Sequence, residues 1–346
     1  KDLSKVRGIT YRDREGIHRN PPAERIYALD DLPAPAYHLL DINKYALNME
    51  FLDKRGISTI TSRGCLARCS FCSASRMFNH QVTTHSASRV LDDIELLFDK
   101  FGYKGIKIFD STLTMQREHV DDLCDEITRR RLNFPWECEI RVGTVDQEML
   151  EKMMDAGCYY VNFGVESASQ KVLNLMRKGF TVEQAQELLD WCIRIDLKTK
   201  VFFSFGHIGE TMENVERTFE FIDKNANKIT TVASGAGVRI YPGTYLEEYA
   251  VKNRFLPEGF KWSLPYDDER LESILQTRCV PILLQPQLGF AELERIALRI
   301  YRRRFSGFQG LKRGFTKITD KDKLKKLWQL LKIQFRQVFK KDRSLK

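Results

Sequence analysis

The chain has 346 residues, of which 42% are hydrophobic and 30% are charged. This composition is typical of a soluble globular protein, and no apolar run approaches the ~20 residues of a membrane-spanning helix, which excludes a helical membrane protein. The net charge of +9 is gathered at the end of the chain, because residues 291–346 hold 18 Lys and Arg against 5 Asp and Glu. Residues 1–5 lack the apolar core of a secretory signal, so we expect a cytoplasmic location.

Residues 1–50 show little hydrophobic periodicity, and we expect an N-terminal linker that lies along a larger body. Two short runs, 8–12 and 24–26, fit β-strands. The segment 30–36 contains two prolines, which disfavour helix at the residues before them and predict an extended path.

From residue 57 onward, short apolar runs alternate with amphipathic helical patterns. The predicted strands cover residues 57–61, 105–110, 137–142, 159–165, 199–205 and 231–240. The predicted helices cover residues 87–101, 118–131, 146–156, 169–176, 182–195, 212–224 and 245–252. Six successive strand–helix units predict parallel strands joined by right-handed crossovers. A closed eight-fold barrel takes ~250 residues, so six units within residues 51–252 predict an α/β fold with a partial (β/α)6 TIM-like barrel.

Residues 253–346 lose this alternation, and we expect a mainly helical, basic C-terminal extension. Helical patterns cover residues 269–284, 291–305 and 321–341. The third is amphipathic, and we expect it to pack on the barrel with its Lys and Arg side chains in water. The alternatives are a peripheral contact with an anionic membrane and binding of nucleic acid. We expect no nucleic-acid partner, because no nucleic-acid-binding motif accompanies this helix.

Three cysteines, Cys65, Cys69 and Cys72, form a C-x3-C-x2-C motif in the loop after the first predicted strand. Iron–sulfur clusters are held by cysteine thiolates, usually four, so three ligands would leave one iron open to a substrate-like group. A zinc ion completed by His80 or His85 is the alternative, although zinc favours C-x2-C pairs and a closed set of four ligands. The other five cysteines stand singly in apolar patterns, as buried free thiols do.

Polar residues follow four of the other predicted strands: Asp110, Arg141, Glu166 and His207. The carboxyl ends of parallel strands meet at one end of such a barrel, and chemistry collects there. We therefore expect these side chains to lie near the cysteine loop.

The motif, with an aromatic residue (Phe71) before the third cysteine and a strand–helix series around it, resembles the radical S-adenosylmethionine (SAM) superfamily. This resemblance implies a partial (β/α)6 barrel in which Cys65, Cys69 and Cys72 hold a [4Fe–4S] cluster. It implies that the amine and carboxylate of SAM chelate the fourth iron, and that one electron from the reduced cluster yields a 5′-deoxyadenosyl radical. The implied partners are a small-molecule or lipid-like substrate and a reductant such as flavodoxin or ferredoxin.

The same resemblance places five residues, beside Phe71, in contact with the cofactor SAM: Asp110, Ser111, Arg141, Glu166 and Lys178. Asp110 and Ser111 follow the second strand, where the family usually has Gly-Gly-Glu or a pair of acids for the SAM amine. This chain has a single acid there. Lys178 resembles a basic residue that reaches the SAM carboxylate. As an alternative, Arg141 and Lys178 would form ordinary surface ion pairs.

The segment 206–211 resembles the Gly-x-Pro-Gly-Glu-Thr turn of the family, with His207 and Ile208 in place of an apolar residue and proline. We expect Glu210 to fix this turn rather than to touch the substrate. We expect His207 to be a solvated loop histidine, with an acid–base role or a cofactor contact as the alternative. Residues 241–244 resemble the Tyr-Pro-Gly-Thr signature that follows the sixth strand.

Three further segments, 8–12, 29–35 and 62–65, resemble radical SAM enzymes that carry an N-terminal cobalamin-binding domain. That group contains methyltransferases and the anaerobic magnesium-protoporphyrin monomethyl ester cyclase. The Asp-x-His-x-x-Gly motif of the cobalamin domain is not in this sequence, so that domain would lie upstream or be missing altogether.

The function expected from this resemblance is a cobalamin-linked methyl transfer to an unactivated carbon of a small or lipid-like metabolite. One alternative is an oxidative cyclisation or rearrangement, started by the same radical, in which no methyl group is transferred. The other alternative is a non-catalytic module that binds zinc or an iron–sulfur cluster.

Overall fold

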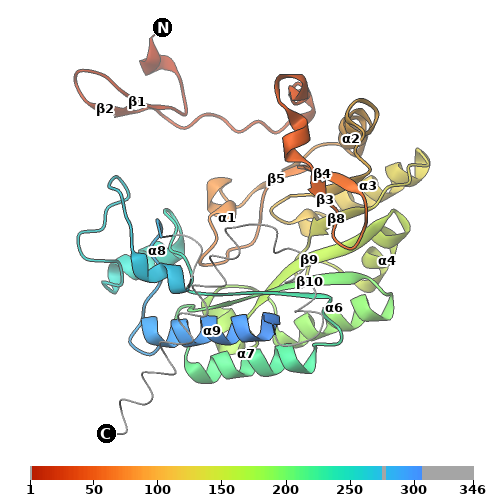
Figure 1. Cartoon of the computed structure of the whole chain (residues 1–346). Helices are drawn as coiled ribbons and strands as arrows, with labels where there is room; N and C mark the ends of the chain where they lie inside the picture. Colours follow the sequence, from red (N-terminus) through yellow and green to blue (C-terminus); the bar gives the residue numbers. More distant parts are fainter. Residues whose placement is uncertain (1, 275–277, 306–346) are drawn as a thin grey trace, which may run out of the picture.

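The computed structural model describes residues 2–274 and 278–305. Its main sheet has seven strands: β3 Leu47–Asn48, β4 Arg55–Thr59, β7 Gly105–Ile108, β8 Trp136–Glu139, β9 Cys158–Glu166, β10 Lys198–Phe205 and β11 Thr231–Ala236. Their order in space is β11-β10-β9-β8-β7-β4-β3, and only β3 runs antiparallel to its neighbour. Because β3 and β11 stay at opposite edges, the sheet curls without closing, and the predicted partial (β/α)6 barrel is confirmed (Figure 1).

The described helices are α1 Ala74–Met77, α2 Ala87–Phe101, α3 Arg117–Arg129, α4 Gln147–Asp155, α5 Gln170–Leu175, α6 Val182–Arg194, α7 Met212–Lys224, α8 Tyr245–Lys252 and α9 Phe290–Phe305. None of them combines the length and the apolar character that a membrane span would need. The predicted helix 291–305 is confirmed by α9, whereas the predicted helix 321–341 lies outside the described residues. The borders predicted between linker, barrel and extension stay predictions.

Strand β10 shows how the sheet separates the core from the barrel interior. Val201, Phe203 and Phe205 are buried, and the rings of Phe203 and Phe205 pack against aromatic side chains of α7. The alternate residues Phe202 and Ser204 are half-buried on the opposite face. Because successive side chains of a strand point to opposite faces, every second residue of β10 faces the inside of the barrel.

Arg25 is one of the residues that tie the N-terminal region to the barrel. Strand β1 (Thr10–Arg12) pairs with β2 (Ile17–Arg19), and this hairpin stands away from the barrel (Figure 1). The strand predicted at 24–26 does not form. Instead, the Arg25 guanidinium donates to Thr83 Oγ1 at 2.9 Å and to the backbone oxygen of Phe78 at 2.8 Å. These bonds hold the linker against the chain that follows the cysteines.

The helix predicted over 269–284 is wrong. Glu269–Ser273 forms a short 3-10 helix, and Ile282 pairs with Arg239 in an antiparallel β-bridge. Pro281 opposes a helix in the last part of this segment, because proline lacks a backbone N–H and disfavours helical geometry at the residue before it.

Candidate active site at the cysteine loop

Eight of the nine predicted site residues line a single cavity of about 220 Å³. They are Cys65, Cys69, Phe71, Cys72, Ser111, Arg141, Glu166 and Lys178. The loops that leave β4, β7, β8 and β9 supply most of these residues, as the parallel arrangement requires. The predicted convergence of these eight residues is therefore found in the structure, and Asp110 is the exception.

The cysteine loop is anchored through the backbone of Ser70, which lies between Cys69 and Phe71. The Ser70 N–H donates to the Met176 oxygen at 2.8 Å, and its carbonyl accepts from the Leu246 N–H at 2.8 Å. Leu246 lies in α8, after the sixth barrel strand. This bond therefore joins the loop after the first barrel strand to the last unit, across the open side of the barrel.

The path into the loop requires glycine at one position. Strand β5 (Ser62–Gly64) pairs with β6 (Val82–Thr84), and Gly64 has a φ of +104°. A Cβ atom at Gly64 would lie 1.9 Å from the backbone oxygen of Gln81. Only glycine combines this backbone conformation with so close an approach, and Cys65 follows directly.

The three cysteines fit an iron–sulfur cluster better than a zinc ion. Their thiols are free, and their Sγ atoms do not all lie within 4.8 Å of one another. Thiolates around one zinc ion lie about 4 Å apart, given Zn–S bonds of ~2.3 Å. Among the described residues, neither His80 nor His85 joins the cysteines in a group whose ligand atoms all lie within 4.8 Å of one another; His80 Nδ1 lies 3.4 Å from the Ala67 oxygen and His85 Nδ1 lies 3.0 Å from Asp30 Oδ1.

Arg141 brings positive charge to the cysteines. Its Nη1 lies 3.3 Å from Cys69 Sγ, and its Nη2 donates to the backbone oxygen of Lys178. Arg141 therefore places a guanidinium donor against the sulfur of a predicted cluster ligand. Burial raises the pKa of the Cys72 thiol, so this cysteine depends on a bound metal to hold its thiolate form.

Lys178 and Glu166 form a buried ion pair in the cavity wall. Lys178 Nζ lies 3.5 Å from Glu166 Oε1, and the two side chains are 6% and 14% exposed. The alternative of a surface ion pair is therefore wrong for Lys178. Glu166 Oε2 accepts from Ser204 Oγ at 2.5 Å, and Ser204 Oγ lies 2.7 Å from His207 Nε2. Because the hydroxyl gives its one proton to the carboxylate, His207 Nε2 must donate to Ser204, and the four side chains form one connected chain.

The backbone of Glu166 is strained. Its φ of +69° lies in the left-handed region, which residues other than glycine rarely adopt. A register shift between Phe202 and Phe203 of β10 sets Glu166 opposite Phe203. Strain of this kind persists only where the surrounding structure enforces it, and here it fixes the carboxylate at the cavity wall.

The expectation that His207 is solvated is wrong. The residue is 2% exposed, and its ring centroid lies 5.1 Å from that of Phe71 in the cysteine loop. Burial, followed by the charge of Lys178, lowers the pKa of His207 to about 3, so the imidazole is neutral near pH 7. The side-chain amide of Gln285 covers the turn and donates to the His207 backbone oxygen at 2.8 Å. Ser204 was missed from the sequence, although period-two alternation places it on the inner face of its strand.

Glu210 fixes the turn, as expected. Its Oε2 accepts from the N–H groups of Gly206 and His207 at 2.6 and 3.0 Å, and the side chain is fully buried. Burial raises the pKa of Glu210 to about 7, although both backbone donors act in the opposite direction.

Asp110 lies outside the cavity lining and is occupied by four hydrogen bonds. Its oxygens accept from the backbone N–H groups of Thr61 and Ser62 at 2.7 and 3.1 Å, and from both hydroxyls at 2.6 Å. His119 Nε2 extends this network, 2.8 Å from Thr61 Oγ1. Asp110 therefore fixes the segment that leads into the cysteine loop, and its contact with SAM stays a prediction.

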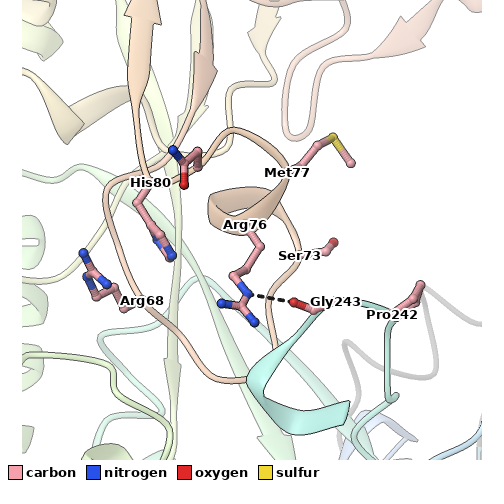
Figure 2. A pocket seen from close by; sticks show the side chains of 8 residues that line it. Arg68, Ser73, Arg76, Met77, His80, Pro242 and Gly243 are labelled. Carbon is pink, nitrogen blue, oxygen red and sulfur yellow. Dashed lines mark hydrogen bonds between the residues drawn. The ribbon is translucent and has the colours of Figure 1, made fainter. Parts of the chain in front are cut away.

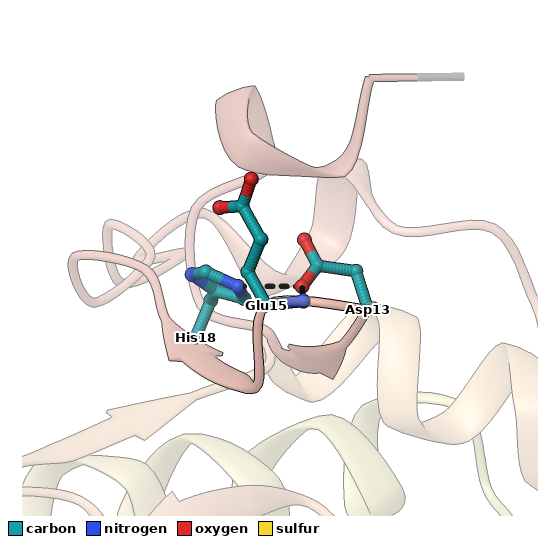
Figure 3. Close-up of side chains that lie close together, drawn as sticks. All are labelled: Asp13, Glu15 and His18. Atoms are coloured by element: carbon teal, nitrogen blue, oxygen red, sulfur yellow. Dashed lines mark hydrogen bonds and ion pairs between the residues drawn. The ribbon is translucent and has the colours of Figure 1, made fainter.

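One other group resembles a metal site within the described part of the chain. Asp13, Glu15 and His18 lie together at the tip of the β1–β2 hairpin (Figure 3). Asp13 Oδ1 accepts from the backbone N–H groups of Glu15 and Gly16 at 2.8 and 3.2 Å, and it lies 2.8 Å from His18 Nε2. An aspartate that caps its own turn in this way stabilises a hairpin, which accounts for the cluster.

Comparison with known proteins identifies the domain that contains this cavity. The family model of the radical SAM superfamily matches residues 59–222. The chain contains a radical SAM domain. Members of this superfamily are enzymes that use a [4Fe–4S] cluster and SAM as cofactors. The expected recognition is confirmed.

Two relatives of the radical SAM domain are named for different activities. The chain is 32% identical over 259 residues to an uncharacterized methyltransferase of Pyrococcus horikoshii, covering 74% of this chain and 54% of the relative. It is 28% identical over 221 residues to the anaerobic magnesium-protoporphyrin IX monomethyl ester cyclase of Rubrivivax gelatinosus, covering 63% and 39%. The chain spans about half or less of the length of these relatives.

A solved structure supports the fold of the radical SAM domain. The cobalamin-dependent SAM radical enzyme OxsB, with aqua-cobalamin and SAM bound, superposes with a TM-score of 0.69 at 18% identity. The match covers 96% of this chain and 52% of the OxsB chain. The barrel and its C-terminal helix α9 are therefore a known arrangement.

Proposed function

We propose that this domain cleaves SAM reductively and directs the resulting radical to an unactivated carbon of a small or lipid-like metabolite, in a cobalamin-linked methyl transfer. The observation that carries the proposal is the shared cavity, in which three free thiols lie beside Arg141 and the Lys178–Glu166 pair. A [4Fe–4S] cluster and SAM, when bound there, supply the 5′-deoxyadenosyl radical.

The residues of the cavity suit the two ends of an amino acid. Lys178 and Arg141 offer cationic donors for the carboxylate of SAM, and Glu166 offers an acceptor for its amine. Ser111 follows β7, lines the same cavity and adds a hydroxyl. Asp110 accepts from Thr61 and so fixes the segment that leads into the cysteine loop. These contacts fix the orientation of the methionine part relative to the three thiols.

Aromatic side chains form the apolar part of the wall. Phe71, Phe163 and Phe202 line the cavity beside the charged groups. Such walls exclude water, which strengthens the charged contacts and protects a reactive radical from side reactions.

The experiment that tests SAM cleavage is anaerobic reconstitution with iron and sulfide, followed by SAM and dithionite. We expect a [4Fe–4S] absorption spectrum that changes on addition of SAM, and release of 5′-deoxyadenosine. Cys69→Ala should abolish cleavage without unfolding the barrel, whereas Cys279→Ala, an exposed cysteine away from the motif, should leave cleavage intact. Full activity in Cys69→Ala would refute the ligand assignment.

One comparison supports methyl transfer, and a second supports a cobalamin cofactor. The Pyrococcus relative is described as a methyltransferase, and OxsB is cobalamin-dependent. The cobalamin would be held by a domain outside this chain. The test is to express the complete gene and to supply SAM labelled in its methyl group. Label recovered on a bound corrinoid supports the proposal, and a gene product that binds no corrinoid refutes it.

An oxidative cyclisation is the second candidate, favoured by the similarity to the magnesium-protoporphyrin cyclase. The same cavity would generate the radical, and no methyl group would leave SAM for the substrate. Cleavage of SAM to 5′-deoxyadenosine, with the labelled methyl group retained in methionine, would favour this candidate.

A further inference from the structure

A second hollow of about 660 Å³ lies beside the cysteine loop, where α1 faces the turn after the sixth barrel strand (Figure 2). Arg68, Arg76 and His80 line it on one side, and Pro242 and Gly243 on the other. A smaller hollow of about 80 Å³ shares these three basic residues and is lined by Cys69 as well. The two hollows together lead from the surface to a cysteine of the cluster motif.

The hollows carry an excess of positive charge. Their walls contain three arginines and one carboxylate, Glu248, which is ion-paired with Arg76. Arg68 is exposed and forms no hydrogen bond or ion pair with any residue in the described ranges. Arg177 stacks its guanidinium 3.7 Å from the centroid of the Tyr245 ring, and no carboxylate of the described residues pairs with it.

Exposed apolar side chains accompany this charge. Met77 lines the larger hollow and is 72% exposed, and Leu66 of the cysteine loop is 48% exposed. Apolar contacts bordered by charge are typical of small, transient protein interfaces, and a flexible methionine adapts to its partner. The combination indicates a surface for a protein rather than for a small ion.

We propose that these two hollows and their apolar rim are the docking surface of an acidic one-electron donor protein, of the flavodoxin or ferredoxin kind. The inference rests on the proposed function, in which Cys69 is a ligand of the cluster. One electron passes from the reduced donor to the cluster, so that the donor is oxidised and the cluster reduced by one electron, with no bond or proton exchanged. Transfer falls steeply with distance, and this surface brings the donor to a cluster ligand.

Charge complementarity favours this partner over nucleic acid. Within the two hollows, the positive charge comes from three arginines that line the smaller one, whereas nucleic-acid surfaces carry a continuous basic stripe. Residues 1–290 also have a small net negative charge, so the patch is a local feature of the surface. Opposite charge accelerates and orients the encounter of two redox proteins, mainly at low ionic strength.

The test compares Arg68→Glu and Met77→Glu with Arg217→Glu, a charge reversal on the outer helix α7. Binding of an oxidised flavodoxin to the reconstituted protein is measured by interferometry at about 0.02 and about 0.15 M salt. Cluster bleaching by reduced flavodoxin and by dithionite is followed in parallel. We expect Arg68→Glu to weaken binding and slow donor-driven bleaching about tenfold at low salt, and Met77→Glu to do so less. Bleaching by dithionite should not change in either variant, and Arg217→Glu should behave as wild type.

The outcomes distinguish failure of the docking surface from failure of the proposed function. Equal flavodoxin binding and equal bleaching in all three variants would overturn the docking surface while leaving SAM cleavage untouched. A protein that takes up no cluster would refute the proposed function, and the binding measurement on iron-free protein would still decide the docking surface. If Arg68→Glu abolished binding of an oligonucleotide or of anionic vesicles but not of flavodoxin, the occupant would be of that class and the proposal would be wrong.

Discussion

The guanidinium of Arg141 lies 3.3 Å from the sulfur of Cys69. The same group is bonded to the backbone oxygen of Lys178, whose ammonium pairs with Glu166. One arginine therefore connects a predicted cluster ligand to the residues that suit the ends of SAM.

Arg141→Gln should raise the dissociation constant for SAM about tenfold, because a charge-assisted hydrogen bond is worth about 1.5–3 kcal/mol. Arg141→Lys should recover only part of the loss, since lysine keeps the charge but lacks the planar fork. Equilibrium dialysis on protein with equal iron content measures the effect. Arg117→Gln, an exposed arginine of α3, serves as control, and wild-type affinity in Arg141→Gln would contradict the assignment.

Glu166→Gln should lower the free energy of unfolding by about 3 kcal/mol, because it leaves the Lys178 ammonium buried without a counter-charge. The double variant Glu166→Gln with Lys178→Met should regain part of that stability, since the uncompensated charge is removed with its partner. Urea unfolding of the iron-free proteins provides both values. A double variant less stable than the sum of the single changes would argue against a charge effect.

Asp110→Asn should destabilise the fold by about 2–4 kcal/mol, because the new amide group faces hydrogen-bond donors of Thr61 and Ser62. The matched control is Asp122→Asn, an exposed residue of α3. Unfolding curves in urea distinguish this positioning role from a direct contact with SAM. If Asp110 served SAM alone, the iron-free variant would be as stable as the wild type.

The stability of the iron-free protein should depend on His207 in acid. The pKa of His207 is about 3 in the folded state and near 6.5 when unfolded, so the unfolded chain binds the extra proton as pH falls below 6.5. The contribution of this residue is thus fully present above pH 6.5 and falls by about 1 kcal/mol per pH unit below it. His207→Phe should remove this slope.

Glu210 provides the control for that measurement, because its effect has the opposite sign. Its pKa of about 7 in the folded state lies above the value of 4.5 that is usual for glutamate, so its stabilising contribution is present below pH 4.5 and is lost as pH rises to 7. Glu210→Gln should therefore steepen the loss of stability in acid between pH 6.5 and 4.5. Thermal unfolding at pH 7.5 and 5.5 gives both slopes, and identical profiles in wild type and His207→Phe would exclude a buried neutral imidazole.

Much of the architecture was predictable from local patterns. Strand and helix periodicities recur six times, and the parallel order they impose brings the loops after successive strands together. For this reason residues as distant in sequence as Cys69 and Glu166 could be assigned to one end of the barrel before their contacts were known.

The failures arose where burial depends on remote segments. The local sequence predicts that His207 is an exposed turn residue. It is covered instead by Gln285, which lies 78 positions later in the sequence. The four donors to Asp110 were not foreseen, because Thr61 and Ser62 lie 49 and 48 positions before it in the sequence, although the predicted contact of Asp110 with SAM stays a prediction. Ser204 joins the site only through its hydrogen bond to Glu166. No sequence pattern predicts the left-handed backbone conformation of Glu166.

The two backbone bonds of Ser70 set an order on the maturation of this protein. They reach Met176 and Leu246, which the ribosome adds long after the three cysteines. The loop cannot take its final shape on a nascent chain that ends before α8. We therefore expect chains truncated before residue 246 to lack this anchor of the cysteine loop and to have thiols that are more exposed to oxidation.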